Sequence, residues 1–173
     1  MAKPKIVDIH DWLEVVHQFE HESDRGLAVL AGSFVEHALG AFLQRHVADK
    51  GVGEKLFGPV GPLSSFSQRT LVAYAFGLLT KAQYEDLEAI RQARNYFAHD
   101  PLHATFSSPE VQKHTKRMTH FETEMHEGSG TLHKHRLAYG FTCSALLHVL
   151  LPPSDKPLPK PFKVRSRKAE SAA

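Results

Sequence analysis

Residues 27–47 read LAVLAGSFVEHALGAFLQRHV, and this stretch decides the fold class because it is apolar at helical spacing throughout. One apolar face is formed by residues that recur every three or four positions: Leu27, Leu30, Phe34, Ala38, Ala41 and Phe42. Small residues between them allow a second helix to approach closely: Ala31, Gly32, Ser33 and Gly40. We therefore predict a long core helix over residues 27–47, which Gly51-Val52-Gly53 ends.

Other stretches of the chain have the same helical periodicity, at residues 8–22, 65–79, 80–99, 108–125 and 131–151. Ser65 with Gln68, and Thr80 with Gln83, are typical of capping boxes at helix starts. Gly77 lies near one helix end, Asp100-Pro101 ends the helix over 80–99, and Ser108-Pro109 starts the next with Ser108 as its N-cap. Residues 127–130 interrupt the pattern before the last helix. Since no strand or repeat is evident, we predict an all-α, single-domain bundle of about six helices over residues 1–151.

The segment 152–173 differs in composition from the rest. It contains five prolines and six basic residues against two acidic ones. Such a sequence favours extended conformations and buries little apolar surface. We expect an extended or disordered basic tail.

The composition of the chain argues against a secreted, membrane-bound or strongly duplex-binding protein. The chain has 173 residues, one cysteine, 13 histidines and a formal net charge of +2. A single cysteine excludes an intramolecular disulfide framework, and the N-terminus has no secretory signal, so we expect a cytoplasmic protein. The longest apolar stretch, residues 137–151, is too short to span a bilayer, so we expect no membrane association. The small net charge does not favour strong binding to duplex nucleic acid.

The string Ile90-Arg91-Gln92-Ala93-Arg94-Asn95-Tyr96-Phe97-Ala98-His99 is the strongest local feature. Arg91, Asn95 and His99 follow one another at four-residue spacing, and Arg94 lies beside that line. Two interpretations are open. In the first, these polar groups are structural, pairing with carboxylates or capping the helix. In the second, Arg94 and His99 form a phosphodiester site, with His99 moving a proton and Arg94 stabilising charge.

A second polar feature, Glu22-Ser23-Asp24-Arg25-Gly26, precedes the core helix. Ser23 or Asp24 suits a helix cap, and Arg25 at the positive helix end is best explained by an ion pair. We predict a polar site in which the following residues lie close together: Arg25, Asp86, Arg94, Asn95 and His99. Arg25 or Arg94 should engage a carboxylate, and the candidates are Glu22, Asp24, Glu36 and Asp86.

No cofactor or metal is predicted. The histidine pairs His17/His21, His99/His103 and His133/His135 lack a third local ligand, whereas zinc needs three or four. The loop from Leu56 to Ser67 is rich in Gly, Pro and Ser but lacks the lysine and spacing of a P-loop. Cys143 lies in an apolar stretch, where a thiol is usually buried and inert.

Several of these segments together resemble the mannitol operon repressor (MtlR) family of transcriptional regulators. The matching residues are Glu22–Gly26, Leu56-Phe57, Gly61-Pro62-Leu63-x-Ser65-Phe66-Ser67-x-Arg69, Ala73-Tyr74-Ala75-x-Gly77-Leu78, Tyr84-x-Asp86-Leu87-x-x-Ile90-Arg91, Arg94-Asn95-x-Phe97-Ala98-His99, Phe106 and Ser108–Val111. The resemblance implies an all-helical fold and repression of sugar-alcohol uptake operons. It also implies a regulator without a helix-turn-helix. The sequence agrees, because only Lys113 to Arg117 clusters bases on a predicted helix. Control through a protein partner is therefore expected.

Arg94-Asn95-x-x-x-His99 also resembles the R-x4–6-H motif of the HEPN superfamily. That resemblance implies a metal-independent endoribonuclease in which Arg94 and His99 are catalytic, or a non-catalytic RNA-binding relative. We favour the regulator over the enzyme. We also expect a homodimer, since the apolar residues of two helices exceed what a small domain covers: Ala28, Ala31, Gly32, Val35, Leu39 and Leu43, with Phe141, Ala145, Leu146, Leu150 and Leu151.

Overall fold

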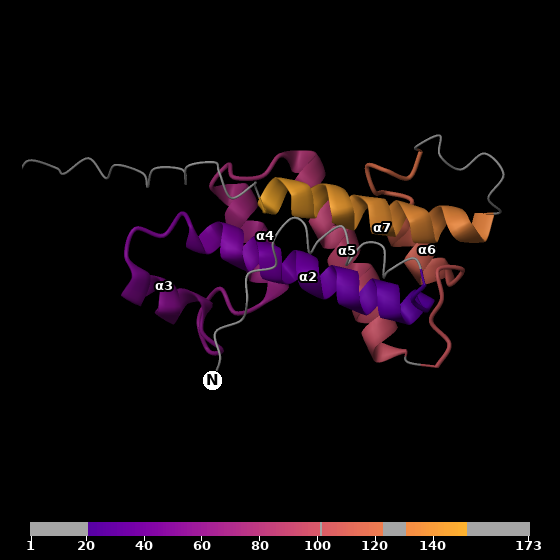
Figure 1. The fold of residues 1–173 in the computed structure, drawn as a ribbon, viewed down its shortest axis with the longest axis horizontal. Coiled ribbons are helices and arrows are strands. Elements are labelled where there is room, and N and C mark those ends of the chain that lie inside the picture. Colours follow the sequence, from indigo (N-terminus) through magenta and orange to yellow (C-terminus); the bar gives the residue numbers. More distant parts are fainter. Residues whose placement is uncertain (1–20, 101, 123–130, 152–173) are drawn as a thin grey trace, which may run out of the picture.

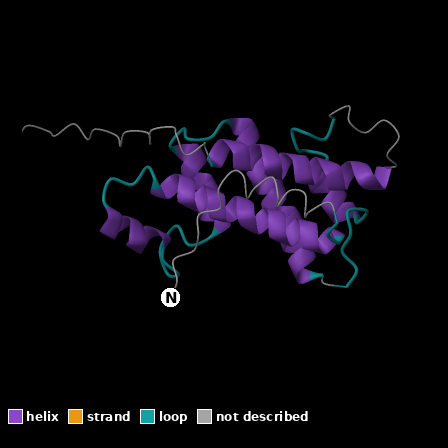
Figure 2. Cartoon of the chain, viewed as in Figure 1, coloured by secondary structure: helices purple, strands orange, loops and turns teal. Residues whose placement is uncertain are grey.

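The computed structural model describes residues 21–100, 102–122 and 131–151, with the side chains of 131–133 outside that description. Its helices are α2 (Asp24–Gln44), α3 (Lys50–Phe57), α4 (Phe66–Ala75), α5 (Lys81–His99), α6 (Pro109–Thr115) and α7 (Thr131–Leu150). These ranges contain no strand, as Figure 2 shows, so the predicted all-α fold is confirmed. The expected helix over 8–22, the break at 127–130 and the tail over 152–173 lie outside the described residues.

Helix α2 lies at the centre of the bundle and packs against α7, α5 and α4 (Figure 1). It runs parallel to α7, because Arg136 and Tyr139 of α7 reach Asp24 and Ala28 of α2 in the same order. It runs antiparallel to α5. The first turn of α2 bonds to the loop beyond α5, whereas Glu36, farther along α2, meets Arg94.

The buried face of α2 differs from the predicted one. Leu30 is 43% exposed, while Ala28, Ala31 and Val35 are fully buried. The prediction missed this because α2 is apolar or small on most sides, so periodicity alone does not select one face. Contact with three helices selects the side that carries the smallest residues.

Most of the apolar residues from which a homodimer was predicted are buried within this chain, whereas Phe141, Ala145 and Leu151 are half-buried. The α2 residues counted as surplus are buried within this single chain: Ala28, Ala31, Gly32, Val35, Leu39 and Leu43. In α7, Leu146 and Leu150 are buried as well. By length and composition α2 is apolar enough to cross a membrane, but half of its apolar window is buried in the bundle, as in a core helix.

Gly32 allows the three central helices to meet. A Cβ atom at this position would lie 2.7 Å from the Tyr139 hydroxyl oxygen and 3.1 Å from Cδ of Arg94. Tyr139 is fully buried, and its hydroxyl donates a hydrogen bond of 2.7 Å to the backbone oxygen of Ala28. The missing side chain of Gly32 therefore provides the space in which α7 and α5 both contact α2.

The helix ends follow the sequence signals closely around α4 and α5. Both predicted capping boxes are present, at Ser65 with Gln68 and at Thr80 with Gln83. Gly77 has a φ of +68°, which glycine adopts without strain, and it ends α4 with hydrogen bonds from Gly77 N to Tyr74 O and from Leu78 N to Ala73 O. These bonds define a Schellman motif.

Three predicted bounds are wrong. Helix α2 ends at Gln44, and Gly51-Val52-Gly53 does not interrupt helical structure but lies inside α3. Asp49 causes this, since its side chain accepts a hydrogen bond from Val52 N and caps α3 despite the glycines. Helix α6 has seven residues and ends at Thr115, well before residue 125. Its N-cap Ser108 makes no side-chain cap bond and instead accepts one from Thr105 N.

We predict that Gly32→Ala destabilises the fold by about 1–3 kcal/mol, the usual cost of an overpacked core, because Tyr139 and Arg94 must move. The matched control is Gly140→Ala in α7, where an added Cβ would meet no heavy atom within 4 Å. Its helix propensity should stabilise α7 by up to about 1 kcal/mol. Urea unfolding of the two variants measures both effects, and equal shifts would contradict the packing described for Gly32.

Candidate functional site

Arg94 is held by α2. Its guanidinium forms an ion pair with Glu36, and both side chains are only about one-fifth exposed. The same group lies 5.6 Å from the centre of the Phe66 ring, and Nη2 donates a hydrogen bond of 3.4 Å to Oδ1 of Asn95. Glu36 is one of the four carboxylates expected to be its partner. Arg94 therefore joins α5 to α2, and its charge is already neutralised within the chain.

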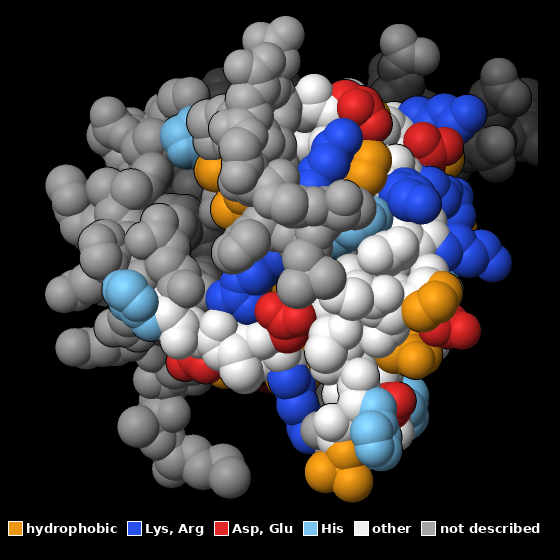
Figure 3. Space-filling view, turned by 90° about the vertical axis from the view of Figure 1, so that its right-hand side faces the viewer, with side chains coloured by type: hydrophobic (Ala, Val, Ile, Leu, Met, Phe, Trp, Pro, Cys, Tyr) orange, Lys and Arg blue, Asp and Glu red, His pale blue; other side chains and the backbone are white. Residues whose placement is uncertain are grey.

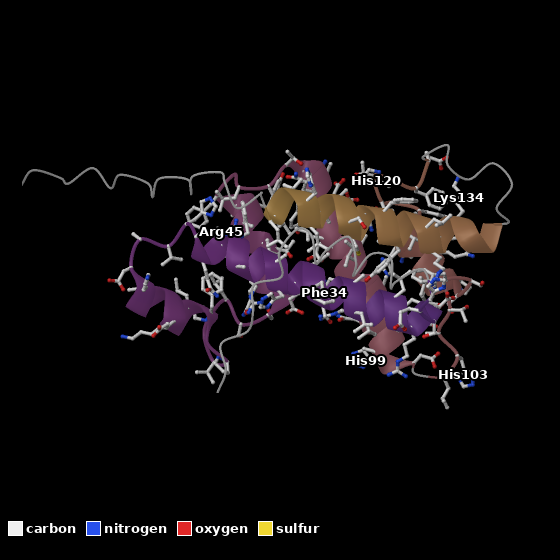
Figure 4. All side chains as sticks on the ribbon, viewed as in Figure 1. Phe34, Arg45, His99, His103, His120 and Lys134 are labelled. Carbon is white, nitrogen blue, oxygen red and sulfur yellow. The ribbon has the colours of Figure 1, made fainter. Side chains whose placement is uncertain are left out.

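The other polar residues of α5 do not gather around Arg94. Arg91 pairs with Glu88, one turn earlier on the same helix, at 2.8 Å. His99 is exposed in the last turn, and Figure 4 shows it with His103 at the far end of α5. Within the described ranges, Arg94 and His99 share no hydrogen bond. The structure thus brings Asn95 to Arg94 and leaves His99 apart.

A second polar network joins the starts of α2 and α7. The Asp24 carboxylate accepts hydrogen bonds from Phe106 N at 2.9 Å and from Nη1 of Arg136 at 2.7 Å. Nη2 of Arg136 also donates to the backbone oxygen of Glu22. Figure 3 views this end of the molecule and shows Lys and Arg side chains with acidic ones between them. Asp24 and Glu22 were predicted site residues, but Arg136 was not, because its partners lie more than 100 residues away along the chain.

Asp86 belongs to neither network. It is buried on α5, and its Oδ1 accepts a hydrogen bond of 2.9 Å from Thr119 N. Burial raises the pKa of the Asp86 carboxyl, and the hydrogen bonds from Thr119 oppose that rise. Asp86 therefore fastens the segment after α6 to α5.

A buried histidine, His135, was not predicted as a site residue on its own. It is 1% exposed, shares a hydrogen bond of 2.6 Å with the Thr115 hydroxyl, and lies against the Phe121 ring. Burial lowers the pKa of His135, and the positive charges of Lys116 and Lys134 lower it further. Its position on the inner side of α7 could be found only from tertiary packing.

The Gly/Pro/Ser loop before α4 is fastened by Arg69. Nε of Arg69 donates to the backbone oxygen of Leu63 at 2.8 Å, and Nη2 donates to that of Ser64 at 3.2 Å. The guanidinium also lies 5.9 Å from the Phe57 ring centre. Arg69 thus links the loop to α3 and α4. This residue is one of those on which the resemblance to the mannitol repressor family rests, and its role here is structural.

The described side chains hold few groups suited to catalysis. Across the described ranges, no three His, Cys, Asp or Glu side chains are grouped so as to bind a metal ion. Cys143 is buried, and burial raises the pKa of its thiol far above the ordinary value. A protonated, inaccessible thiol is a poor nucleophile. The arrangement is that of a helical bundle whose polar motif residues mainly hold helices together.

The chain matches the mannitol repressor family over residues 13–136. This match spans more than half of the sequence, so the protein belongs to the mannitol repressor family, which confirms the resemblance. The fold is shared with a chain of a solved structure, the X-ray structure of the MtlR–HPr complex from Escherichia coli. The TM-score is 0.64 at 19% identity, over 80% of this chain and 96% of that chain. No curated protein matches the sequence.

Loss of the Arg94–Glu36 pair should destabilise the fold. We expect Arg94→Ala to cost about 1.5–3 kcal/mol, the range for a hydrogen bond to a charged group. Arg91→Ala is the matched control on the same helix, because its pair with Glu88 is local and worth about 0.2–0.5 kcal/mol. Urea unfolding of both variants tests this. If Arg94→Ala costs no more than Arg91→Ala, the structural role of Arg94 is wrong.

The stability of the fold should fall as the pH drops below 6.5. His135 has a lowered pKa in the folded chain, so the unfolded chain, with the ordinary value of 6.5, binds a proton more readily. His114, whose pKa is lowered mainly by burial and then by Lys113, acts in the same direction. Urea midpoints should therefore be higher at about pH 7.5 than at about pH 5.5.

Replacing His135 isolates its share of this pH dependence. In a His114→Gln background, adding His135→Gln should flatten the change in urea midpoint between the two pH values. If the difference in urea midpoint between the two pH values stays unchanged, His135 does not have a lowered pKa.

Proposed function

We propose that this protein is a transcriptional regulator of the mannitol repressor type that acts by binding a protein partner. In this proposal it neither reads DNA through a helix-turn-helix nor cleaves RNA. The partner class is a protein of the HPr kind. The observation that carries the proposal is the shared fold with a chain solved in the MtlR–HPr complex.

Family membership and extent of overlap support a protein partner. The family match covers residues 13–136, and the structural similarity includes nearly all of the compared chain. The shared fold over almost the whole of a chain solved in a complex supports a related contact by this chain. Binding of an HPr-type protein by this chain is therefore the first activity to measure.

The geometry argues against α6 as a DNA-reading helix. The basic cluster expected on one helix is divided, since α6 ends at Thr115 and Lys116 and Arg117 follow it. Seven residues form about two turns, whereas a recognition helix presents several side chains along the major groove. This supports control through a partner over direct sequence-specific DNA binding.

The alternative is an endoribonuclease of the HEPN type, or a non-catalytic RNA-binding relative. The exposed position of His99 favours it, because a proton-transferring group must reach substrate. The pairing of Arg94 with Glu36 opposes it, since a neutralised guanidinium stabilises a phosphorane poorly. We therefore place the enzyme second.

Two finer features belong to the same proposal. We expect the regulator to function in the cytoplasm, because its single cysteine is free and buried, as is typical of proteins in a reducing compartment. We also retain the homodimer as a prediction, although the buried residues of α2 do not support it. Light scattering of the purified chain gives its mass directly, and a monomer mass at micromolar concentration would end that prediction.

The test combines partner binding with RNA cleavage. Calorimetric titration of the full chain with Escherichia coli HPr should show a saturable complex. The His99→Ala variant should remain folded, because His99 is exposed and lies outside the packed core. Structured RNA incubated with the same proteins should remain intact.

Two outcomes together would overturn the proposal. They are the absence of any complex with HPr, and RNA cleavage that is lost in both Arg94→Lys and His99→Ala. Arg94→Lys keeps the positive charge opposite Glu36, and circular dichroism shows whether each variant is folded.

A further inference from the structure

The outward side of α4 is apolar over its last two turns. Leu71 is 57% exposed, Tyr74 is 38% exposed, and Phe76 at the C-cap is 69% exposed. Val72, which is half-buried, and Ala75, which is exposed, extend this apolar surface around the helix. The opposite side of α4 already supplies the core contacts through Phe66, Thr70 and Ala73. We refer to Leu71, Val72, Tyr74, Ala75 and Phe76 as the α4 apolar face.

Tyr74 of this face stacks on Tyr84 of α5. The rings of Tyr74 and Tyr84 stack with their centres 4.6 Å apart and their planes inclined by 25°. The Glu85 side chain follows Tyr84 on α5 and is 46% exposed. The stacked tyrosines present flat apolar surface and hydroxyl groups, while the Glu85 carboxylate is already paired with Lys81 at 3.7 Å. Proline-rich segments bind aromatic surfaces of this kind.

The end of α7 lies at the same end of the bundle as α4. Because α7 runs parallel to α2, its last turn lies alongside the C-terminal half of α2. The same half of α2 holds α4, since the Arg69 guanidinium lies against Gly40. Helix α5 runs antiparallel to α2, so it also begins there. Figure 1 shows the end of α7 beside the α4–α5 connection.

The residues that follow α7 have matching chemistry. Leu150 is buried and Leu151 packs against the core, so the chain leaves the bundle at a fixed point. The sequence then reads PPSDKPLPKPFKV over residues 152–164. Its prolines, with Leu158 and Phe162, offer apolar surface at low entropic cost, and Lys156 and Lys160 offer positive charge. As polyproline II, these 13 residues span about 40 Å.

We propose that residues 152–164 dock on the α4 apolar face of the same molecule, with prolines against the Tyr74–Tyr84 pair. Attachment at Leu151 favours this occupant over a second copy, because a short linker gives an effective concentration of about millimolar. The proposal is independent of the proposed function, and it replaces the expectation of a free basic tail. It makes the tail a cover for apolar surface that is otherwise exposed to water.

The test places a spin label on the tail of the full chain. Ser166→Cys introduces a reactive thiol four residues beyond Phe162, and native Cys143 is 1% exposed and does not react. Paramagnetic broadening of methyl signals then reports which surface the tail visits. The methyls of Leu71 and Val72 should lose most of their intensity.

Leu102 is the matched control for that broadening. It is 84% exposed in the loop after α5, at the opposite end of the bundle and about 30 Å away by the length of α2. Its methyl signals should keep their intensity. Phe76→Ser, at an exposed position, should restore the Val72 signal, whereas Leu102→Ser should not.

Three results would overturn the proposal. The first is equal broadening of Leu102 and Val72, and the second is a Val72 signal that Phe76→Ser leaves broadened. The third is broadening of an isotope-labelled chain without a spin label when it is mixed with a spin-labelled, unlabelled chain. That result would assign the α4 apolar face to a second copy.

Discussion

The close approach of three helices at Gly32 is the constraint on which the rest of the structure depends. With no side chain at this position, α2 admits the buried Tyr139 hydroxyl from α7 and the Arg94 stem from α5. The hydroxyl then reaches the Ala28 carbonyl, and the guanidinium reaches Glu36. These two contacts fix α7 parallel and α5 antiparallel to α2. They therefore also fix where the ends of α5 and α7 lie. His99 lies at one end of the bundle. Helix α4 and Leu151, the last described residue after α7, lie at the other end.

In this arrangement, several of the polar residues singled out in the sequence hold helices together. Arg94 and Asn95 form part of the contact between α5 and α2, and Asp24 and Arg136 join the starts of α2 and α7. These residues lie within the range that matches the mannitol repressor family, and their side chains are engaged in contacts between helices. Under the proposed function, the partner-binding surface is expected among exposed groups, since buried pairs are already satisfied.

Local signals in the sequence were enough to predict the all-α class and several helix ends. The caps at Ser65 and Thr80 and the turn at Gly77 depend only on residues within about four positions. They can therefore be predicted from the sequence alone. The short helix α3 was missed because its glycines favour a break, and the Asp49 cap overrides them. The pairing of Arg94 with one of four possible acids depends on packing between distant segments, as does the buried contact of His135 with Thr115. Spacing alone cannot determine such contacts.

The central claim is that Arg94 serves the fold through Glu36, and a double-mutant cycle tests it most directly. The free energies of unfolding of Arg94→Ala, Glu36→Ala and the double variant give the coupling between the two side chains. A direct, partly buried pair predicts a coupling of about 0.5–3 kcal/mol. A coupling of zero, with the two single effects simply adding, would contradict the account and show that the guanidinium is not held by Glu36 in solution.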